Sequence, residues 1–61
     1  AMQGNAEAEN KLGVMYHYGH GVPEDRAEAE RWYEKAAAQG HRLAKYNLSC
    51  LRHENSRRGL A

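Results

Sequence analysis

An internal repeat with a period of 36 residues constrains this 61-residue chain more than any other feature. When residues 1–25 are aligned with residues 37–61, six pairs are identical, and all six fall within the first 17 pairs. The identical pairs are Ala1/Ala37, Gln3/Gln39, Gly4/Gly40, Ala8/Ala44, Leu12/Leu48 and His17/His53. Such a period is typical of stacked helix–turn–helix units, none of which buries its apolar face alone. The sequence therefore predicts an all-α chain with one complete unit and parts of two others.

The period divides the chain into four segments. Residues 1–4 are expected to end a helix of a preceding unit, and residues 5–40 to form one complete unit. Residues 41–53 are expected to be the first helix of a following unit, and residues 54–61 a polar, basic tail. Because no apolar side chain lies between Leu51 and Leu60, we expect the chain to fray from residue 53 onward.

Capping signals place the helix ends. The expected helices span residues 5–18, 26–39 and 41–53. Asn5 is a suitable N-cap for the first helix, and Asp25 caps the second, with Glu28 at capping-box spacing. Gly19 is expected to close the first helix in a left-handed conformation, and Gly40 to be the C-terminal stop of the second. The third helix begins near His41 with a poorer cap.

Apolar and small residues recur at helical spacing on one face of each expected helix. These faces are Ala8, Leu12, Met15, Tyr16 and Gly19 in the first helix; Ala29, Trp32, Tyr33, Ala36, Ala37 and Gly40 in the second; and Leu43, Ala44, Leu48 and Leu51 in the third. Gly13 lies inside the first helix, where glycine costs up to about 1 kcal/mol relative to alanine. We interpret it as a site where the second helix approaches closely, beneath Trp32 or Ala36.

Composition limits what such a chain can do. Leu, Ile, Val and Phe together number seven, so the core must be thin, which excludes a deep enzyme-type cavity walled by one chain. The one cysteine, Cys50, excludes an internal disulfide framework and a cysteine-rich zinc site. The longest apolar run is three alanines at residues 36–38, so no membrane-spanning segment is expected.

The charge is divided unevenly along the chain. Residues 1–40 carry four basic and seven acidic groups, a net −3, whereas residues 41–61 carry five basic and one acidic, a net +4. A basic tail can contact acidic partners. The helical body is acidic, however, and the tail holds no aromatic residue on which a base could stack, so we expect no nucleic-acid partner.

Side chains that could carry chemistry are few and poorly placed. His17 and His20 have a spacing that could direct two imidazoles to one metal ion, but no third ligand lies near them in the sequence. Neither Ser49 nor Ser56 has a lysine three residues later, and no nucleophile-elbow motif is present. We therefore expect no catalytic residue, no cofactor and no metal.

Two stretches carry a family resemblance. The first is Leu12-Gly13-Val14-Met15-Tyr16-His17-Tyr18-Gly19-His20-Gly21-Val22-Pro23-Glu24-Asp25, and the second is Trp32-Tyr33-Glu34-Lys35-Ala36-Ala37-Ala38-Gln39-Gly40. Over about residues 4–51 the chain resembles the Sel-one-like (Sel1-like) repeat, a relative of the tetratricopeptide repeat. The resemblance implies an α-α superhelix of paired antiparallel helices.

The chain departs from the family pattern at Ser49, where a second glycine is usual, and at Arg52, where the tyrosine matching Tyr16 is usual. It also lacks a second turn and a second B helix. These departures suggest a terminal or degenerate repeat, or a boundary set by where the sequence was cut.

The resemblance implies a scaffold or adaptor that joins a protein or peptide partner and has no catalytic activity of its own. The first helices of such repeats line a concave surface, so we expect partner contacts from the outward residues of the first helix. These residues are Asn10, Lys11, Val14, His17 and Tyr18. Neighbouring repeats or self-association are also expected.

Two alternatives stay open: a β-lactam-type hydrolase or small-molecule-binding repeat protein, and a structural end cap or self-associating fragment of a longer array. The cysteine-rich relatives linked to β-lactams pair two cysteines in each repeat, and the lone Cys50 argues against that subset.

Overall fold

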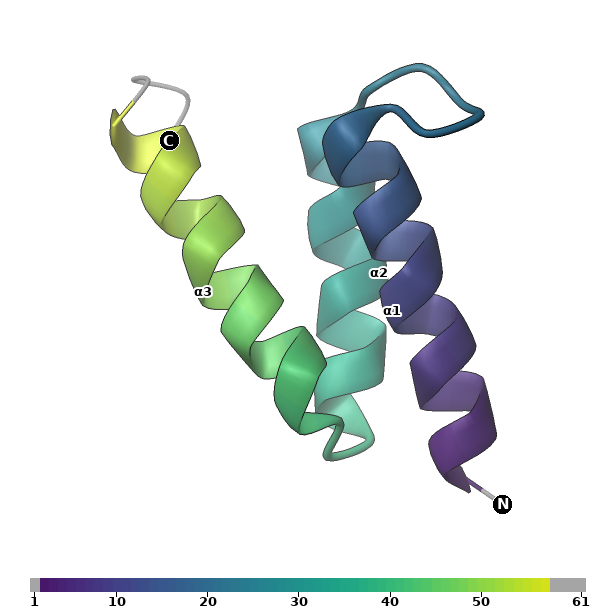
Figure 1. Ribbon diagram of the computed structural model, residues 1–61. Helices are drawn as coiled ribbons and strands as arrows, with labels where there is room; N and C mark the ends of the chain where they lie inside the picture. Colours follow the sequence, from purple (N-terminus) through teal and green to yellow (C-terminus); the bar gives the residue numbers. More distant parts are fainter. Residues whose placement is uncertain (1, 58–61) are drawn as a thin grey trace.

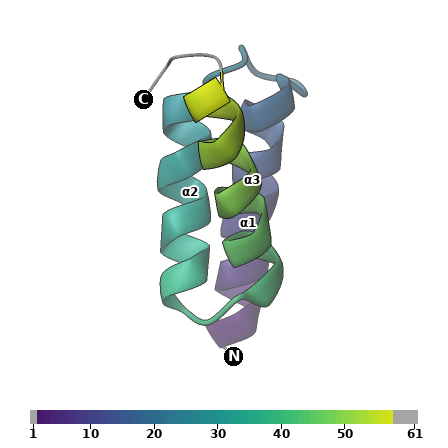
Figure 2. The same cartoon turned by 90° about the vertical axis from the view of Figure 1, so that its left-hand side faces the viewer.

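The computed structural model describes residues 2–57, which form three α-helices (Figure 1). They are α1 (Met2–Tyr18), α2 (Arg26–Ala38) and α3 (Arg42–Arg57). α1 and α2 pack side by side as an antiparallel pair, and α3 packs chiefly against α2. The view along the other direction shows α3 in front of the pair, closing one side of it (Figure 2). The all-α prediction is confirmed.

α1 begins earlier than its cap signal indicated. The helix runs from Met2 through Asn5 without a break, so the predicted start at Asn5 is wrong. The preference of Asn for an N-cap is worth only about 1 kcal/mol, so it does not by itself prevent a helix from continuing through that residue. The assignment of residues 1–4 to a preceding unit stays a prediction, and Ala1 lies outside the described residues.

α2 begins as its caps predict and ends one residue earlier. The Asp25 carboxylate accepts a hydrogen bond from the Glu28 N–H at 3.1 Å. The reciprocal half of the capping box does not form, because the Asp25 N–H donates instead to the Tyr16 carbonyl at 2.9 Å. That bond ties the turn back onto the end of α1.

The end of α2 is a Schellman motif built on Gly40. This residue has φ of +86°, a conformation that side chains disfavour. Its N–H donates to the Ala37 carbonyl at 2.9 Å, and the His41 N–H donates to the Ala36 carbonyl at 3.2 Å. The predicted role of Gly40 is confirmed.

α3 is longer and better capped than predicted. The His41 imidazole Nδ1 accepts a hydrogen bond from the Ala44 N–H at 3.2 Å, which supplies the N-cap. The helix continues to Arg57, so the expected fraying over residues 53–57 is wrong. The last turn is held by Glu54, whose polar contacts to other helices an apolar pattern cannot reveal. The rest of the predicted tail, residues 58–61, lies outside the described residues.

Two small clusters form the core. One joins an alanine from each helix, Ala6, Ala36 and Ala44. The other joins Ala29, Tyr33 and Leu51, with Val14, Tyr16 and Leu48 packed against it. The core is therefore thin, as the composition predicted.

The buried face of α1 differs from the predicted one. It consists of Ala6, Asn10, Gly13 and His17, whereas Ala8 is exposed and Leu12 and Met15 are half-buried. Two of the buried side chains are polar and find partners on α3, so a search for apolar periodicity overlooks them.

In the other helices the predicted faces are partly right. Ala29, Tyr33, Ala36, Ala44 and Leu51 are buried. Leu43 was predicted to be in the core and is 54% exposed. Gly40 is also exposed rather than buried. Trp32 is half-buried, with the Lys35 ammonium 4.5 Å from the centre of its ring.

Gly13 allows α2 to approach α1, as predicted, but the residue above it is Tyr33. A Cβ atom at position 13 would lie 2.5 Å from two carbons of the Tyr33 ring. The ring cannot move aside easily, because Tyr33 is 1% exposed and its hydroxyl is hydrogen-bonded to His17.

Gly13→Ala is therefore expected to destabilise the protein by about 1–3 kcal/mol through overpacking, although alanine is the better helix former. Ser49→Ala is the matched control, because Ser49 occupies the same place in the repeat and is exposed on α3. Its effect is expected to stay within about 0.5 kcal/mol. Urea denaturation measures both, and equal effects would contradict the close contact.

Candidate functional site

A polar cluster of four residues, the His17 cluster, connects all three helices. His17 lies on α1, Arg26 and Tyr33 on α2, and Glu54 on α3. The His17 Nδ1 lies 3.1 Å from the Tyr33 hydroxyl, and its Nε2 lies 3.0 Å from Glu54 Oε1. Arg26 Nη1 donates to the same carboxylate oxygen at 2.6 Å. One imidazole thus joins α1 to both other helices.

The partners determine where the protons lie. Because a carboxylate can only accept, Nε2 of His17 carries a proton and donates to Glu54. Burial raises the pKa of Tyr33 to about 12, so this hydroxyl keeps its proton at neutral pH. Hydrogen bonds from Arg26 and His17 lower the pKa of Glu54 to about 2. His17 is 3% exposed with both nitrogens engaged, and its role in this arrangement is to position helices.

A second polar contact joins α1 to α3 two turns away. The Asn47 Nδ2 donates to Asn10 Oδ1 at 3.0 Å. Asn10 is 5% exposed. An amide pair of this kind uses one donor and one acceptor and leaves others on each side chain for further bonds. Together with the His17–Glu54 pair, it fixes the spacing between α1 and α3 at two points along their length.

The five residues predicted to contact a partner differ in their exposure. Lys11 is exposed, Tyr18 is 61% exposed, and Val14 is half-buried against the second core cluster. Asn10 and His17 are buried, so the expectation that they face outward is wrong. The physical reason is that α3 covers them and supplies their hydrogen-bond partners.

Two exposed apolar residues on α3 were not among the predicted site residues. Leu43 is 54% exposed and Tyr46 is 65% exposed. Within residues 5–57, these two and Tyr18 are the large hydrophobic side chains left exposed, and they lie on α1 and α3 rather than α2. The pKa of Tyr46 is raised, chiefly by the interaction of its hydroxyl with the Cys50 thiol. The repeat contained a signal for Tyr46: this residue lies 36 positions after Asn10, which was itself among the predicted contact residues.

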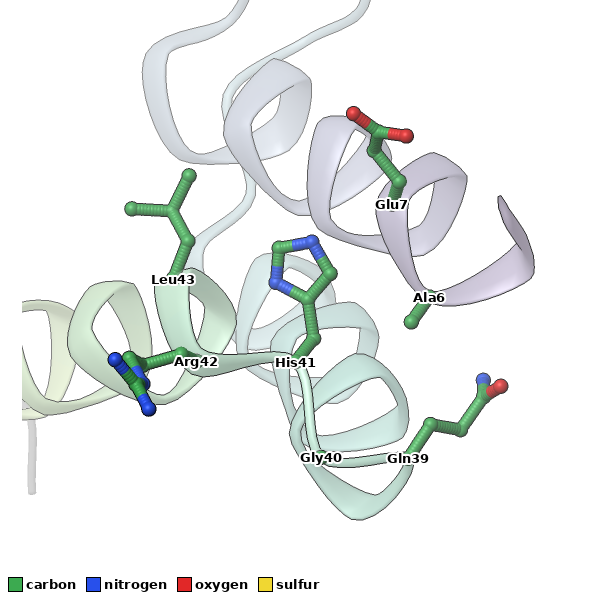
Figure 3. Close-up of a pocket in the computed structure, with 7 residues that line it drawn as sticks. All are labelled: Ala6, Glu7, Gln39, Gly40, His41, Arg42 and Leu43. Atoms are coloured by element: carbon green, nitrogen blue, oxygen red, sulfur yellow. The ribbon is translucent and has the colours of Figure 1, made fainter. Parts of the chain in front are cut away.

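An open cleft of about 530 Å³ lies between the start of α1 and the turn that joins α2 to α3 (Figure 3). It is lined by Ala6, Glu7, Gln39, Gly40, His41, Arg42 and Leu43. The His41 imidazole points from the turn toward α1 (Figure 3). A carboxylate, an imidazole, a guanidinium and the exposed Leu43 side chain are therefore among the groups that line the cleft.

Across the described part of the chain, no three His, Cys, Asp or Glu residues are grouped so that they could hold a metal ion. Over the same residues, no helix combines the length and apolar character needed to cross a membrane.

The antiparallel α1–α2 pair, its Schellman stop and the α3 helix that packs on α2 define a helical repeat protein. A family model described as Sel1 repeat matches residues 6–41, more than half of the chain. The chain belongs to the Sel1 repeat family, which confirms the resemblance seen in the sequence. Comparisons with curated proteins and with solved structures found no match.

The lowered pKa of Glu54 predicts a specific acid sensitivity. Because the pKa is about 2 in the folded protein and 4.5 ordinarily, the bonds to Glu54 stabilise the fold fully above pH 4.5. That contribution is lost as the pH falls from 4.5 toward 2. Glu54→Gln is expected to flatten the fall in the free energy of unfolding over this range, measured by urea denaturation at each pH. Glu7→Gln, at an exposed carboxylate of α1, should leave the fall unchanged, and identical acid profiles for the two variants would contradict the role of Glu54.

Proposed function

We propose that this chain is a non-catalytic protein-interaction module that binds a protein or peptide partner on the side formed by α1 and α3. Sel1 repeats generally mediate protein–protein interactions. The observation that carries the proposal is the distribution of exposed apolar residues: Tyr18 lies on α1, and Leu43 and Tyr46 lie on α3.

The proposed surface suits recognition because its framework is fixed. The Asn10–Asn47 bond and the His17–Glu54 bond hold α1 and α3 at a set spacing. A partner that docks across both helices would therefore not have to order them first. Asn10 and His17 act here as supports beneath the surface rather than as its contact residues.

The side chains above this framework are of kinds that contribute strongly to binding. Tyrosine offers a large contact area at low conformational cost together with a polar hydroxyl. Tyr18 is further ordered by stacking on His17, with ring centres 4.3 Å apart. Lys11 and Val14 add a charge and an apolar contact on the same helix. The proposed contact residues are therefore Lys11, Val14, Tyr18, Leu43 and Tyr46.

A structural end cap is a second candidate, and one face of α3 favours it. The positions of α3 that match the buried face of α1 are Arg42, Tyr46, Ser49 and His53, and all four are exposed. Terminal units of repeat arrays need a polar outer face to stay soluble, and three of these four side chains are polar. Tyr46 belongs to both candidate roles. No feature of the described residues favours the β-lactam-type alternative.

Tyr18→Ala and Tyr46→Ala are expected to weaken binding of a partner peptide by more than about 5-fold each, the loss typical of an exposed anchor. Peptides selected from a displayed random library against the unmodified protein supply the partner, and isothermal titration calorimetry measures the affinity. Helicity should be unchanged, because both side chains are largely exposed.

Arg31→Ala is the matched control, since Arg31 is exposed on α2. Its binding should equal that of the unmodified protein. Selected peptides that lose affinity with Arg31→Ala but not with the tyrosine variants would place the binding surface on α2 and overturn the proposal. Failure to select any peptide with saturable binding would also count against it.

A further inference from the structure

The side of α3 that faces away from α2 carries exposed side chains at helical spacing. α3 lies in front of the α1–α2 pair in Figure 2, so this side is turned away from both helices. The exposed residues lie at positions i, i+3, i+4, i+7, i+11 and i+15, which share one face of a helix. They define the α3 outer face: Arg42, Lys45, Tyr46, Ser49, His53 and Arg57.

The α3 outer face is cationic and carries no carboxylate. Four residues of α3 are basic, and its one acidic residue, Glu54, lies outside this face and is engaged in the His17 cluster. Arg42, Lys45 and Arg57 form no ion pair with any of residues 5–57. Exposed charges of one sign attract and orient a partner of the opposite sign.

The fourth basic residue of α3 shows how such a cation is received by an acidic helix. Arg52 Nε lies 3.2 Å from Glu30 Oε2, and its Nη2 lies 2.8 Å from Glu34 Oε2. The two glutamates are one helical turn apart on α2, so their carboxylates meet the same guanidinium. The molecule thus contains its own example of the carboxylate spacing that suits a basic residue of α3.

A helix like α2 does not fit the α3 outer face. The repeat aligns this face with the buried side of α1 and matches Arg42 with Ala6 and Ser49 with Gly13. A Cβ atom at position 13 would lie 2.5 Å from the Tyr33 ring, and Ser49 has a Cβ atom, so a tyrosine could not approach α3 in the same way. An apolar helix would also bury the Arg42 guanidinium without a counter-charge. The occupant must therefore bring carboxylates.

We propose that the α3 outer face docks an acidic segment of another protein, with carboxylates about one helical turn apart beside an apolar residue. The carboxylates pair with Arg42 and Lys45, which are three positions apart, and Arg57 adds attraction at the other end of α3. The apolar residue packs on Tyr46, which follows Lys45 and is 65% exposed. This inference rests on the proposed function, because it names the chemistry of the partner, and Tyr46 belongs to both surfaces.

A second copy of this chain is a poor occupant, because most of its own carboxylates are already engaged. Within residues 5–57, the acidic side chains without a hydrogen bond or ion pair to one another's helices or turns are Glu7 and Glu28. One lies on α1 and the other on α2. A copy therefore has no free pair of carboxylates one turn apart to offer.

The composition of selected peptides tests the proposal. Peptides are selected from a displayed random library against the unmodified protein and are sequenced before any affinity is measured. They are expected to carry a net negative charge, with Asp or Glu residues three or four positions apart. Their affinity, measured by isothermal titration calorimetry, should fall by roughly 10-fold between about 50 and about 500 mM NaCl.

Charge reversal assigns the effect to the α3 outer face. Arg42→Glu and Lys45→Glu are each expected to weaken the selected peptides by roughly 10-fold. Both positions are exposed in the first turn of α3, where an acidic residue suits the helix dipole, so folding should be preserved. Lys45→Gln is a milder variant, with an expected loss of roughly 3-fold. Arg31→Glu is the matched control, because it makes the same charge change at an exposed position of α2 and should leave binding unchanged.

The possible outcomes separate this inference from the proposed function. Peptides that bind through Tyr18 and Tyr46 but have no excess of acidic residues would overturn the inference and leave the proposed function standing. Failure to select any peptide with saturable binding would overturn both. Equal losses with Arg31→Glu and Lys45→Glu would also contradict a specific role of α3.

Three further probes identify a different occupant. Vesicles of phosphatidylcholine and phosphatidylserine, or a DNA duplex, would replace the acidic protein segment if they bound more tightly than the peptides and lost binding with Lys45→Glu. Sedimentation of the unmodified protein would make a second copy the occupant if it revealed a dimer that Lys45→Glu dissociates. Each of these results would overturn the inference.

Discussion

The contact of Tyr33 with α1 is the interaction on which the rest of the structure depends. Its ring lies over Gly13, where any side chain would collide with it, and its hydroxyl reaches His17 one turn further along α1. His17 is hydrogen-bonded to Glu54 on α3, and Glu54 also accepts a hydrogen bond from Arg26 on α2. Apart from Tyr33, the buried core consists of four alanines and one leucine, and it could not set these helix positions alone because it offers few large side chains to interlock.

Local signals predicted the helices well and the long-range polar contacts not at all. Asp25 and Gly40 mark the two ends of α2 because capping involves residues only three to five positions apart. His17 and Glu54 are 37 positions apart, and nothing in either local sequence indicates that they meet. That missing contact explains two errors together: the expectation that His17 faces a partner, and the expectation that α3 frays before Glu54.

The placement of partner contacts on α1, the first-position helix of the repeat, stays a prediction, whereas the exposure of the individual residues on it could not be predicted in full. Tyr18 and Lys11 are exposed as expected, whereas Asn10 is buried beneath α3. Which outward residues remain free depends on where α3 crosses α1, and helical periodicity within α1 does not contain that information. Leu43 was missed because it was assigned to the core before the packing of its helix was known. Tyr46 was assigned no role, although the repeat aligns it with Asn10.

Identical residues at matching positions of the repeat are packed differently in this molecule. Leu12 and Leu48 are the same residue at the same repeat position, yet only Leu48 packs against a buried cluster. His17 and His53 are likewise identical, and only His17 is buried. Each difference follows from the presence of a neighbouring helix on one side and not the other. The unit is therefore not a self-sufficient fold repeated in tandem, because its apolar surface is divided between the helix it contains and the helices that flank it.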